Sequence, residues 1–106
     1  MNQVVVLRTS VGSKREAQAM ARRLVDTRLA ACAQVTKTWS TYRWQGRIEE
    51  EDEWLVEVKA RPEDQDAVWE AMLEGHPYDT PCVELLGEAT VPARYTKWVS
   101  RATNRS

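Results

Sequence analysis

Apolar and polar residues alternate most regularly along residues 40–59, and this pattern predicts a long β-hairpin. The chain reverses at Gln45-Gly46, a pair typical of tight turns. Because successive side chains of a strand point to opposite faces, we expect one aromatic face and one polar face. The predicted aromatic face carries Tyr42, Trp44, Trp54, Val56 and Val58, and the polar face carries Arg43, Gln45, Glu57 and Lys59. A hairpin so rich in tryptophan predicts a contact surface.

The residues before the hairpin predict a strand, a helix and a second strand. The β-branched run Val4–Thr9 is typical of a short buried strand. Ser13 and Glu16 have the spacing of a helix-capping box, and apolar residues then recur at helical spacing until about Arg28. A strand of small residues, Leu29–Val35, runs on into the hairpin. We therefore expect unusually long strands that project beyond the rest of the domain.

The residues after the hairpin predict a helix, a strand and a final helix. Arg61-Pro62 ends the return strand, because proline cannot donate to a ladder but fits the first turn of a helix. The helical face of Ala67–Leu73 is followed by Gly75, where we expect a left-handed C-terminal cap. Cys82–Ala89 predicts the fourth strand, and Pro92 opens the third helix.

The predicted elements follow the order βαββαβα, which is the ferredoxin-like arrangement. We therefore expect an α+β fold in which an antiparallel four-stranded sheet carries two helices on one face, with an extra C-terminal helix. The 106 residues suit one domain, residues 1–106. The tail Thr103–Ser106 is expected to be frayed.

Composition limits the binding partners and the cellular compartment that we expect. Fifteen basic and sixteen acidic residues leave a formal net charge of -1, so the overall field would attract neither nucleic acid nor an anionic membrane. The apolar run Val4–Leu7 is too short for a signal segment. We therefore expect a cytoplasmic protein in which Cys32 and Cys82 are free thiols.

The chain contains five tryptophans, which is many for its length. Each buries roughly 200 Å², and a core of this size can hardly enclose all of them. Tryptophan and tyrosine are enriched as anchors at subunit interfaces. The tryptophan content therefore predicts a homo-oligomer.

Five separated motifs carry a resemblance to a known family. They are Leu29-Ala30-Ala31-Cys32-Ala33, Ser40-x-Tyr42-x-Trp44-x-Gly46, Val58-Lys59, His76-Pro77-Tyr78-x-x-Pro81 and Tyr95-x-x-Trp98. In this order, along essentially the whole chain, they resemble the CutA divalent-cation tolerance proteins. The resemblance implies a homotrimer of ferredoxin-like subunits joined edge to edge by the long hairpin strands, similar in architecture to the PII signalling proteins. It also implies a role in tolerance to copper and other divalent cations, without catalytic activity.

The same resemblance identifies candidate metal ligands. Family members credited with copper binding use a cysteine late in the first strand and two histidines before the Pro-Tyr pair. Here Arg8 and Gly75 stand at the cysteine and the first histidine, so only His76 matches, and Cys82 replaces an expected acidic residue. We predict His76 and Cys82 as weak ligands of copper or another divalent cation, completed by a neighbouring subunit. The alternative is that His76 only packs beyond a helix C-terminus, where the dipole favours a charged imidazole.

A second candidate site is a cleft between subunits, to which we assign Tyr42, Trp44, Lys59, Tyr78 and Cys32. We expect Lys59 to lie near the two hairpin aromatics across the ladder and to bind a small anion. This gives the alternative function, a PII-like signalling module with an anionic effector and a partner protein that the sequence leaves unknown. The competing interpretations are that Lys59 pairs with an acidic neighbour and that Cys32 is a small buried hydrophobe.

Three other functions lack their signatures. An acylphosphatase-like enzyme shares the predicted topology, but its glycine-rich signature with a second arginine is missing. An RNA-recognition domain needs an aromatic core motif, whereas this chain has no phenylalanine and no basic excess. The acidic run Glu49–Glu53 has no calcium-loop pattern and is interpreted as a solvated hairpin arm.

Overall fold

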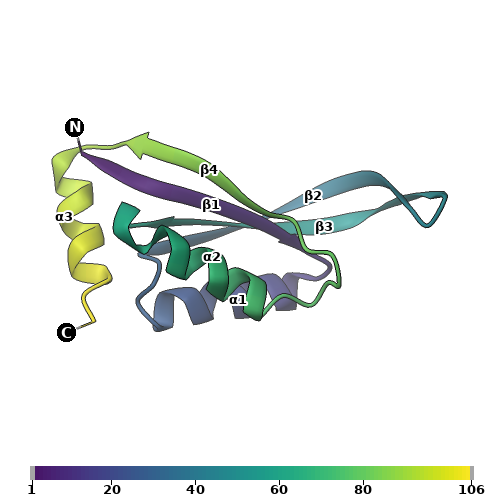
Figure 1. Cartoon of the computed structure of the whole chain (residues 1–106), viewed down its shortest axis with the longest axis horizontal. Helices are drawn as coiled ribbons and strands as arrows, with labels where there is room; N and C mark the ends of the chain where they lie inside the picture. Colours follow the sequence, from purple (N-terminus) through teal and green to yellow (C-terminus); the bar gives the residue numbers. More distant parts are fainter. Residues whose placement is uncertain (1, 106) are drawn as a thin grey trace.

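The computed structural model describes residues 2–105 and contains the predicted elements in the predicted order (Figure 1). They are β1 (Gln3–Val11), α1 (Lys14–Asp26), β2 (Cys32–Trp44), β3 (Arg47–Ala60), the 3-10 turn η1 (Pro62–Asp64), α2 (Gln65–Glu74), β4 (Val83–Thr90) and α3 (Ala93–Ala102). The strands form one antiparallel sheet in the order β2-β3-β1-β4. Every helix within the described residues is too short or too polar to span a lipid bilayer.

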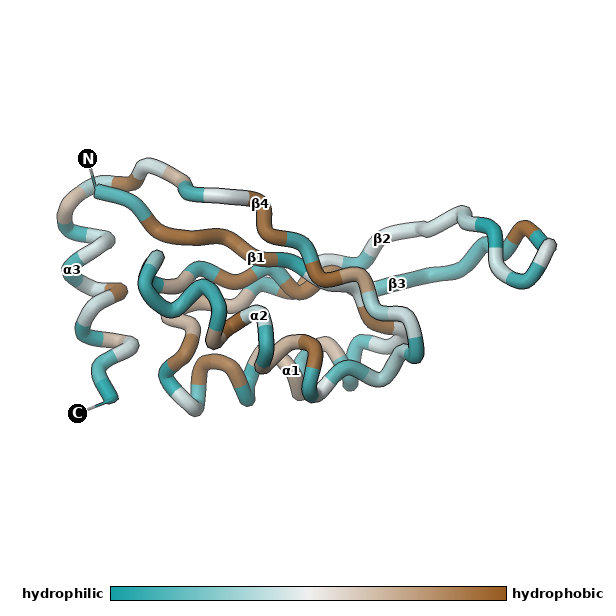
Figure 2. Tube along the Cα trace, in the orientation of Figure 1, coloured by the Kyte–Doolittle hydropathy of each residue, from teal (hydrophilic) through white to brown (hydrophobic). Residues whose placement is uncertain are grey.

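The main core lies between the sheet and the helices α1 and α2 (Figure 1). All of its fully buried members except Ala30, which precedes β2, come from β1, α1, β3 and α2; they include Leu7, Leu24, Val56, Val58 and Met72. Figure 2 shows the apolar run of β1 passing through the middle of the molecule. A second, smaller cluster joins α3 to the end of the sheet through Val4, Ala31 and Val99. The sheet is therefore covered by two helices along one side and by α3 at one end.

The β2-β3 hairpin projects beyond the rest of the domain, as predicted. β1 pairs with β3 only as far as Val11 opposite Trp54, whereas β2 and β3 stay paired to Trp44 opposite Arg47. Residues 38–53 therefore extend past the sheet, which gives the molecule its 47 × 25 × 21 Å shape (Figure 1). The reversal at Gln45-Gly46 is confirmed, and the φ angles of 51° and 78° are those of a type I′ turn.

The predicted composition of the hairpin faces is wrong. Residues directly opposite each other on paired strands share a face, and the two-residue turn places Tyr42 opposite Glu49. Tyr42 and Trp44 therefore share their face with the odd-numbered residues of β3. Trp54, Val56 and Val58 instead lie opposite Lys37, Val35 and Ala33 and turn toward the main core. The alternation within each strand was predicted correctly, but the turn fixes the phase between the strands.

The second strand begins at Cys32 and not at Leu29, which corrects the predicted boundary. Arg28 has a φ of 61°, and the N–H groups of Leu29 and Ala30 both donate to the Leu24 carbonyl. This is a Schellman-type helix end, in which a left-handed residue lets the chain turn back over the last carbonyls. The residues between Asp26 and Cys32 therefore form the C-terminal end of α1 and are not part of β2.

Gly75 is not the left-handed cap that the sequence predicted, because its φ is -94°. The Arg23 guanidinium occupies the space where a side chain at this position would begin, and it donates to the Ala71 carbonyl at 3.0 Å. Close approach of another side chain explains the glycine here, and backbone conformation does not.

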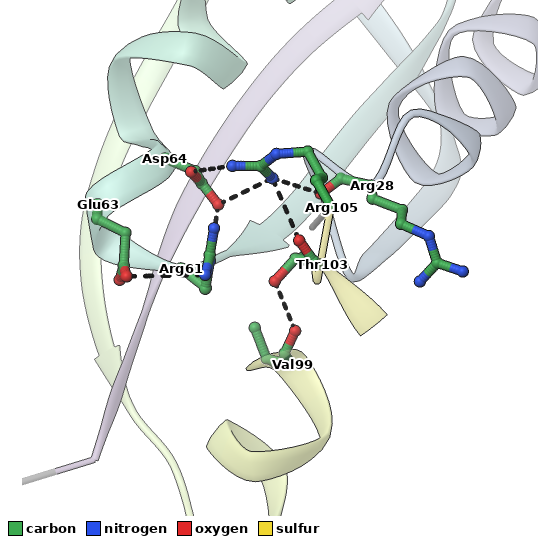
Figure 3. Close-up of polar contacts among 7 residues, drawn as sticks. All are labelled: Arg28, Arg61, Glu63, Asp64, Val99, Thr103 and Arg105. Carbon is green, nitrogen blue, oxygen red and sulfur yellow. Dashed lines mark hydrogen bonds and ion pairs between the residues drawn. The ribbon is translucent and has the colours of Figure 1, made fainter. Parts of the chain in front are cut away.

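The C-terminal tail is held in place as far as Arg105, so the prediction of a frayed end is wrong for the described residues, while Ser106 lies outside them. Thr103 is fully buried and donates to the Val99 carbonyl at 2.7 Å. Arg105 donates to both carboxylate oxygens of Asp64, at 2.8 and 3.3 Å, and Arg61 donates to the same carboxylate at 2.9 Å (Figure 3). We call the group formed by Arg61, Asp64 and Arg105 the tail clasp.

Candidate functional site

The main surface hollow lies where the hairpin leaves the sheet and the loop between α2 and β4 packs against it. It is a groove of about 770 Å³. Its lining includes four aromatic residues, Trp39, Tyr42, Trp44 and Tyr78, three carboxylates, Glu51, Glu53 and Asp79, and Cys82. Among the described residues that line it there is no lysine, arginine or histidine. The groove therefore combines aromatic walls with net negative charge.

Two phenol–carboxylate hydrogen bonds organise the groove. The Tyr78 hydroxyl donates to Glu53 at 2.8 Å, and the Tyr42 hydroxyl donates to Glu51. The hydrogen bond to Glu51 is the main cause that raises the pKa of Tyr42 to about 12, and burial together with the hydrogen bond to Glu53 raises the pKa of Tyr78. Both phenols therefore stay protonated near neutral pH and act as donors. Glu53, only 8% exposed, is thereby fixed at the base of the groove.

His76 is held in a chain of hydrogen bonds beside the groove. Its Nδ1 accepts from the Tyr78 backbone N–H at 3.1 Å, so the ring proton of the neutral form lies on Nε2. Nε2 donates to the Thr9 hydroxyl at 2.9 Å, and that hydroxyl donates to the Cys82 carbonyl at 2.7 Å. Burial lowers the pKa of His76, so the neutral ring is favoured. Neither ring nitrogen can reach a metal ion without breaking one of these bonds.

The predicted metal ligands do not form a complete site within one chain. Within residues 2–105, no three His, Cys, Asp or Glu side chains converge closely enough to hold a metal ion. Cys82 is an exposed free cysteine that lines the groove. His76 donates to the Thr9 hydroxyl, and this hydroxyl donates to the backbone carbonyl of Cys82. A coordination shell for a divalent cation is therefore not preformed here, since such shells need four or more donors.

The two positions where the family resemblance expects further ligands are structurally occupied. Arg8 donates through Nε to Glu84 of β4 at 3.2 Å, an ion pair across two neighbouring strands. At Gly75, the Arg23 guanidinium fills the space that a histidine side chain would need. An arginine side chain therefore occupies the space at both positions, and neither position supplies a ligand for a cation.

The structure separates the residues of the predicted anion cleft into two groups. Tyr42, Trp44 and Tyr78 line the groove together. Lys59 and Cys32 are paired at the opposite end of the hairpin, where Lys59 donates to the Gln34 side chain at 2.9 Å. Cys32 and Tyr42 lie ten residues apart on β2, which is about 33 Å along an extended strand. The prediction that Lys59 lies near the hairpin aromatics is therefore wrong.

Sequence reasoning missed the acidic side of the groove. Glu51 and Glu53 belong to the run Glu49–Glu53 that was interpreted as a solvated arm. A signal for their role was present, because the two-residue turn at Gln45-Gly46 places alternate glutamates on the face of Tyr42. Asp79 had no comparable signal, since the loop that carries it reaches the groove only through tertiary packing.

Comparisons with known proteins agree on one family. Residues 5–102 match the family model described as CutA1 divalent ion tolerance protein. The divalent-cation tolerance protein CutA of Thermus thermophilus is 34% identical over 104 residues, covering 97% of this chain and 99% of that protein. The crystal structure of CutA1 from Pyrococcus horikoshii is 28% identical, with a TM-score of 0.90 and coverage of 95% and 99%. The periplasmic divalent cation tolerance protein CutA from Archaeoglobus fulgidus is 27% identical, with a TM-score of 0.88 and coverage of 95% and 99%.

Proposed function

The chain belongs to the CutA1 divalent ion tolerance family, and from this membership we propose that it acts in tolerance to divalent cations, copper first, by binding them. The observation that carries the proposal is the family match over residues 5–102, almost the entire chain. The fold alone would not suffice, because one fold serves many functions.

The working form we propose is a homotrimer of ferredoxin-like subunits. β2 is an edge strand of the sheet, so one side of its backbone is free to pair with another chain. The same strand exposes large aromatic side chains, with Trp39 at 61%, Trp44 at 45% and Tyr42 at 39%. Of the five tryptophans, Trp54 and Trp69 pack on the core. An exposed edge bordered by aromatic residues is a typical site of assembly.

We place the protein in the cytoplasm, on grounds of composition and chemistry. Its two cysteines, Cys32 and Cys82, are unpaired, which suits a reducing compartment. The Archaeoglobus relative is named as periplasmic, so the compartment is not taken from the relatives.

Metal binding in this proposal is shared between subunits. A single chain supplies no closed ligand set, but its Cys82 thiol is exposed and is a soft donor suited to copper or zinc. His76 serves as a positioning residue, because its hydrogen bond to Thr9 and the bond from Thr9 to the Cys82 carbonyl fix the start of β4. Three-fold symmetry would bring donors of neighbouring subunits into one site.

The alternative function, a module for an anionic effector, gains no support from the geometry. The groove that contains the predicted aromatics carries carboxylates and no basic lining residue among those described. Lys59, the proposed anion-binding residue, lies at the far end of the hairpin and donates to Gln34. A negatively charged groove repels an anion.

The test combines light scattering with calorimetry. We expect a mass three times that of the 12.2 kDa subunit, with and without Cu(II). Titration with Zn(II), which does not oxidise thiols, and with Cu(II) should give binding heats that Cys82→Ser abolishes. Cys32→Ser, the same change at the other cysteine, should leave the isotherms unchanged. Thr9→Val should weaken binding without removing a donor atom.

Each part of the proposal has its own contrary result. A monomeric mass contradicts the trimer. Wild-type isotherms from Cys82→Ser contradict the role of Cys82. No heat from any divalent cation contradicts the binding function itself.

A further inference from the structure

The charge of the chain is distributed unevenly along the molecule. Residues 89–106 contain no acidic residue and four basic ones, Arg94, Lys97, Arg101 and Arg105. Because the formal net charge of the whole chain is -1, residues 1–88 carry -5. The basic segment forms α3 and the tail at one end of the long axis, whereas the acidic run Glu49–Glu53 lies on the hairpin at the other end (Figure 1). The overall charge therefore does not describe what the α3 end attracts.

One side of α3 carries most of this positive charge. Arg94, Lys97, Trp98 and Arg101 are spaced i, i+3, i+4 and i+7, which places them on the same side of the helix. All four are exposed, and the exposed fraction of Trp98 is 41%. The opposite side, which contains Val99, packs on the end of the sheet. We call these four exposed residues the α3 stripe.

The cations of the α3 stripe are not neutralised by neighbours. None of the ion pairs among residues 2–105 involves Arg94, Lys97 or Arg101. Two hollows flank the stripe, and Asp26 is the only acidic residue among the described residues that line them. Arg105 is not counted in the stripe, because the tail clasp already uses its charge. Three positive charges are therefore available to an anionic partner.

The α3 stripe shares no residue with the subunit contact proposed above. That contact uses the edge strand β2 and its aromatic residues, and two further tryptophans, Trp54 and Trp69, pack on the core. Trp98 is the remaining tryptophan and belongs to neither group. A subunit that covered the stripe would also bury three cations, which is costly unless it supplies carboxylates to them. We therefore expect the stripe to face solvent in the assembled protein.

We propose that the α3 stripe docks on the surface of an anionic phospholipid bilayer. Each basic residue near such a surface strengthens binding about fivefold. An exposed tryptophan is favourable at headgroup level, because its ring is apolar and its indole N–H can donate. The protein would lie on the bilayer without crossing it, as an interfacial helix does.

The shape of the surface favours a bilayer over a nucleic acid strand. The stripe lies on the convex side of a helix at the end of the molecule, and the acidic hairpin points away from it (Figure 1). Proteins that bind single strands use a basic groove instead. The inference is independent of metal binding, because β4, about 26 Å long, separates Cys82 from α3.

Vesicle flotation with the assembled full-length protein tests the proposal. Vesicles of equal parts phosphatidylglycerol and phosphatidylcholine should bind the protein, and vesicles of phosphatidylcholine alone should not. Raising NaCl from about 50 mM to about 0.5 M should release it, because salt screens the charges. The tryptophan emission should shift to the blue on binding, and Trp98→Ala should abolish this shift.

Paired double variants separate the stripe from the net charge. Lys97→Gln/Arg101→Gln should weaken vesicle binding at least about tenfold. Lys14→Gln/Arg15→Gln is the matched control, because it removes the same charge from exposed positions in the first turn of α1, near the hairpin end of the sheet. It should change binding by less than about twofold. Cys82→Ser, which tests the metal proposal, should bind vesicles as the wild type does.

Four results would overturn the inference. Equal weakening by the two double variants would mean that the vesicles respond only to net charge. A changed light-scattering mass for Lys97→Gln/Arg101→Gln would place the stripe in the subunit contact. Tighter binding to single-stranded oligothymidylate than to vesicles, at equal phosphate concentration, would assign the stripe to nucleic acid. Absence of binding to the anionic vesicles would reject the proposal directly.

Discussion

Replacement of Arg105 tests whether the tail clasp stabilises the fold. Asp64 is 5% exposed and accepts hydrogen bonds from Arg61 and Arg105, while Arg105 also donates to the Arg28 carbonyl at 2.8 Å (Figure 3). Arg105→Ala removes these bonds and leaves Asp64 with one partner. We expect the free energy of unfolding to fall, because a buried carboxylate then loses half of its compensation.

The magnitude follows from the exposure of the two partners. A hydrogen bond to a charged group contributes roughly 1.5 to 3 kcal/mol. The Arg105 side chain is 38% exposed, however, so solvent screens part of the interaction. We therefore expect a loss of about 1.5 kcal/mol for Arg105→Ala at neutral pH.

The loss should depend on pH. Burial alone would raise the pKa of Asp64, but the hydrogen bonds and charges of Arg105 and Arg61 outweigh it and lower the pKa below 3.8. A carboxyl whose pKa is lowered by folding stabilises the protein above its unfolded value and loses this effect as the pH falls through the folded value. The gap between wild type and Arg105→Ala should therefore be constant near neutral pH and should narrow below pH 3.8.

Urea unfolding followed by tryptophan fluorescence measures the effect, at one protein concentration for all variants because assembly contributes to stability. Arg101→Ala is the matched control, an exposed arginine of α3 whose loss should cost less than about 0.5 kcal/mol. The reasoning is refuted if the two variants lose equal stability, or if the gap for Arg105→Ala stays the same in acid.

Three further changes test local conclusions. Gln45→Asn should raise the unfolding free energy by about 0.5 kcal/mol, because asparagine tolerates the positive φ of 51° better; a loss in urea unfolding would contradict this. His76, the sole histidine, should titrate below 6.5 in NMR with its proton on Nε2. Its lowered pKa means that stability falls as pH drops from 6.5 through the folded value, a dependence His76→Gln should lack. Gly75→Ala should cost under about 1 kcal/mol, since Arg23 can swing aside; a larger loss would indicate a rigid backbone contact.

Local signals in the sequence were sufficient to predict the helices and strands. Ser13 caps α1 as its spacing from Glu16 predicted: the Glu16 N–H donates to the Ser13 hydroxyl at 3.1 Å, and this hydroxyl donates to the Glu16 carboxylate at 3.0 Å. The proline of Arg61-Pro62 opens η1 and Pro92 precedes α3, as their fixed φ favours. Each of these features depends on residues within a few positions of one another, so no knowledge of the tertiary structure was needed.

Contacts between distant residues could not be read in the same way. His76 meets Thr9 across 67 positions, and Arg105 meets Asp64 across 41. Nothing near His76 indicates that its Nε2 will find a hydroxyl, so the choice between a ligand and a structural role stayed open in the sequence. The tail Thr103–Ser106 likewise gives no sign in the sequence that Arg105 will contact the buried Asp64. Its position at the chain end alone predicts fraying.

The groove depends on the number of residues in one turn. With two residues at Gln45-Gly46, Tyr42 lies opposite Glu49 and shares its face with Glu51 and Glu53, which line the groove. One more residue in the turn would move Tyr42 opposite the next residue of β3 and bring Tyr42 and Trp44 onto the face of Trp54. Glu51 and Glu53 would then lie on the opposite face of the hairpin from Tyr42 and Trp44. The positive φ angles at this turn therefore determine the electrostatic character of the groove as well as the shape of the hairpin.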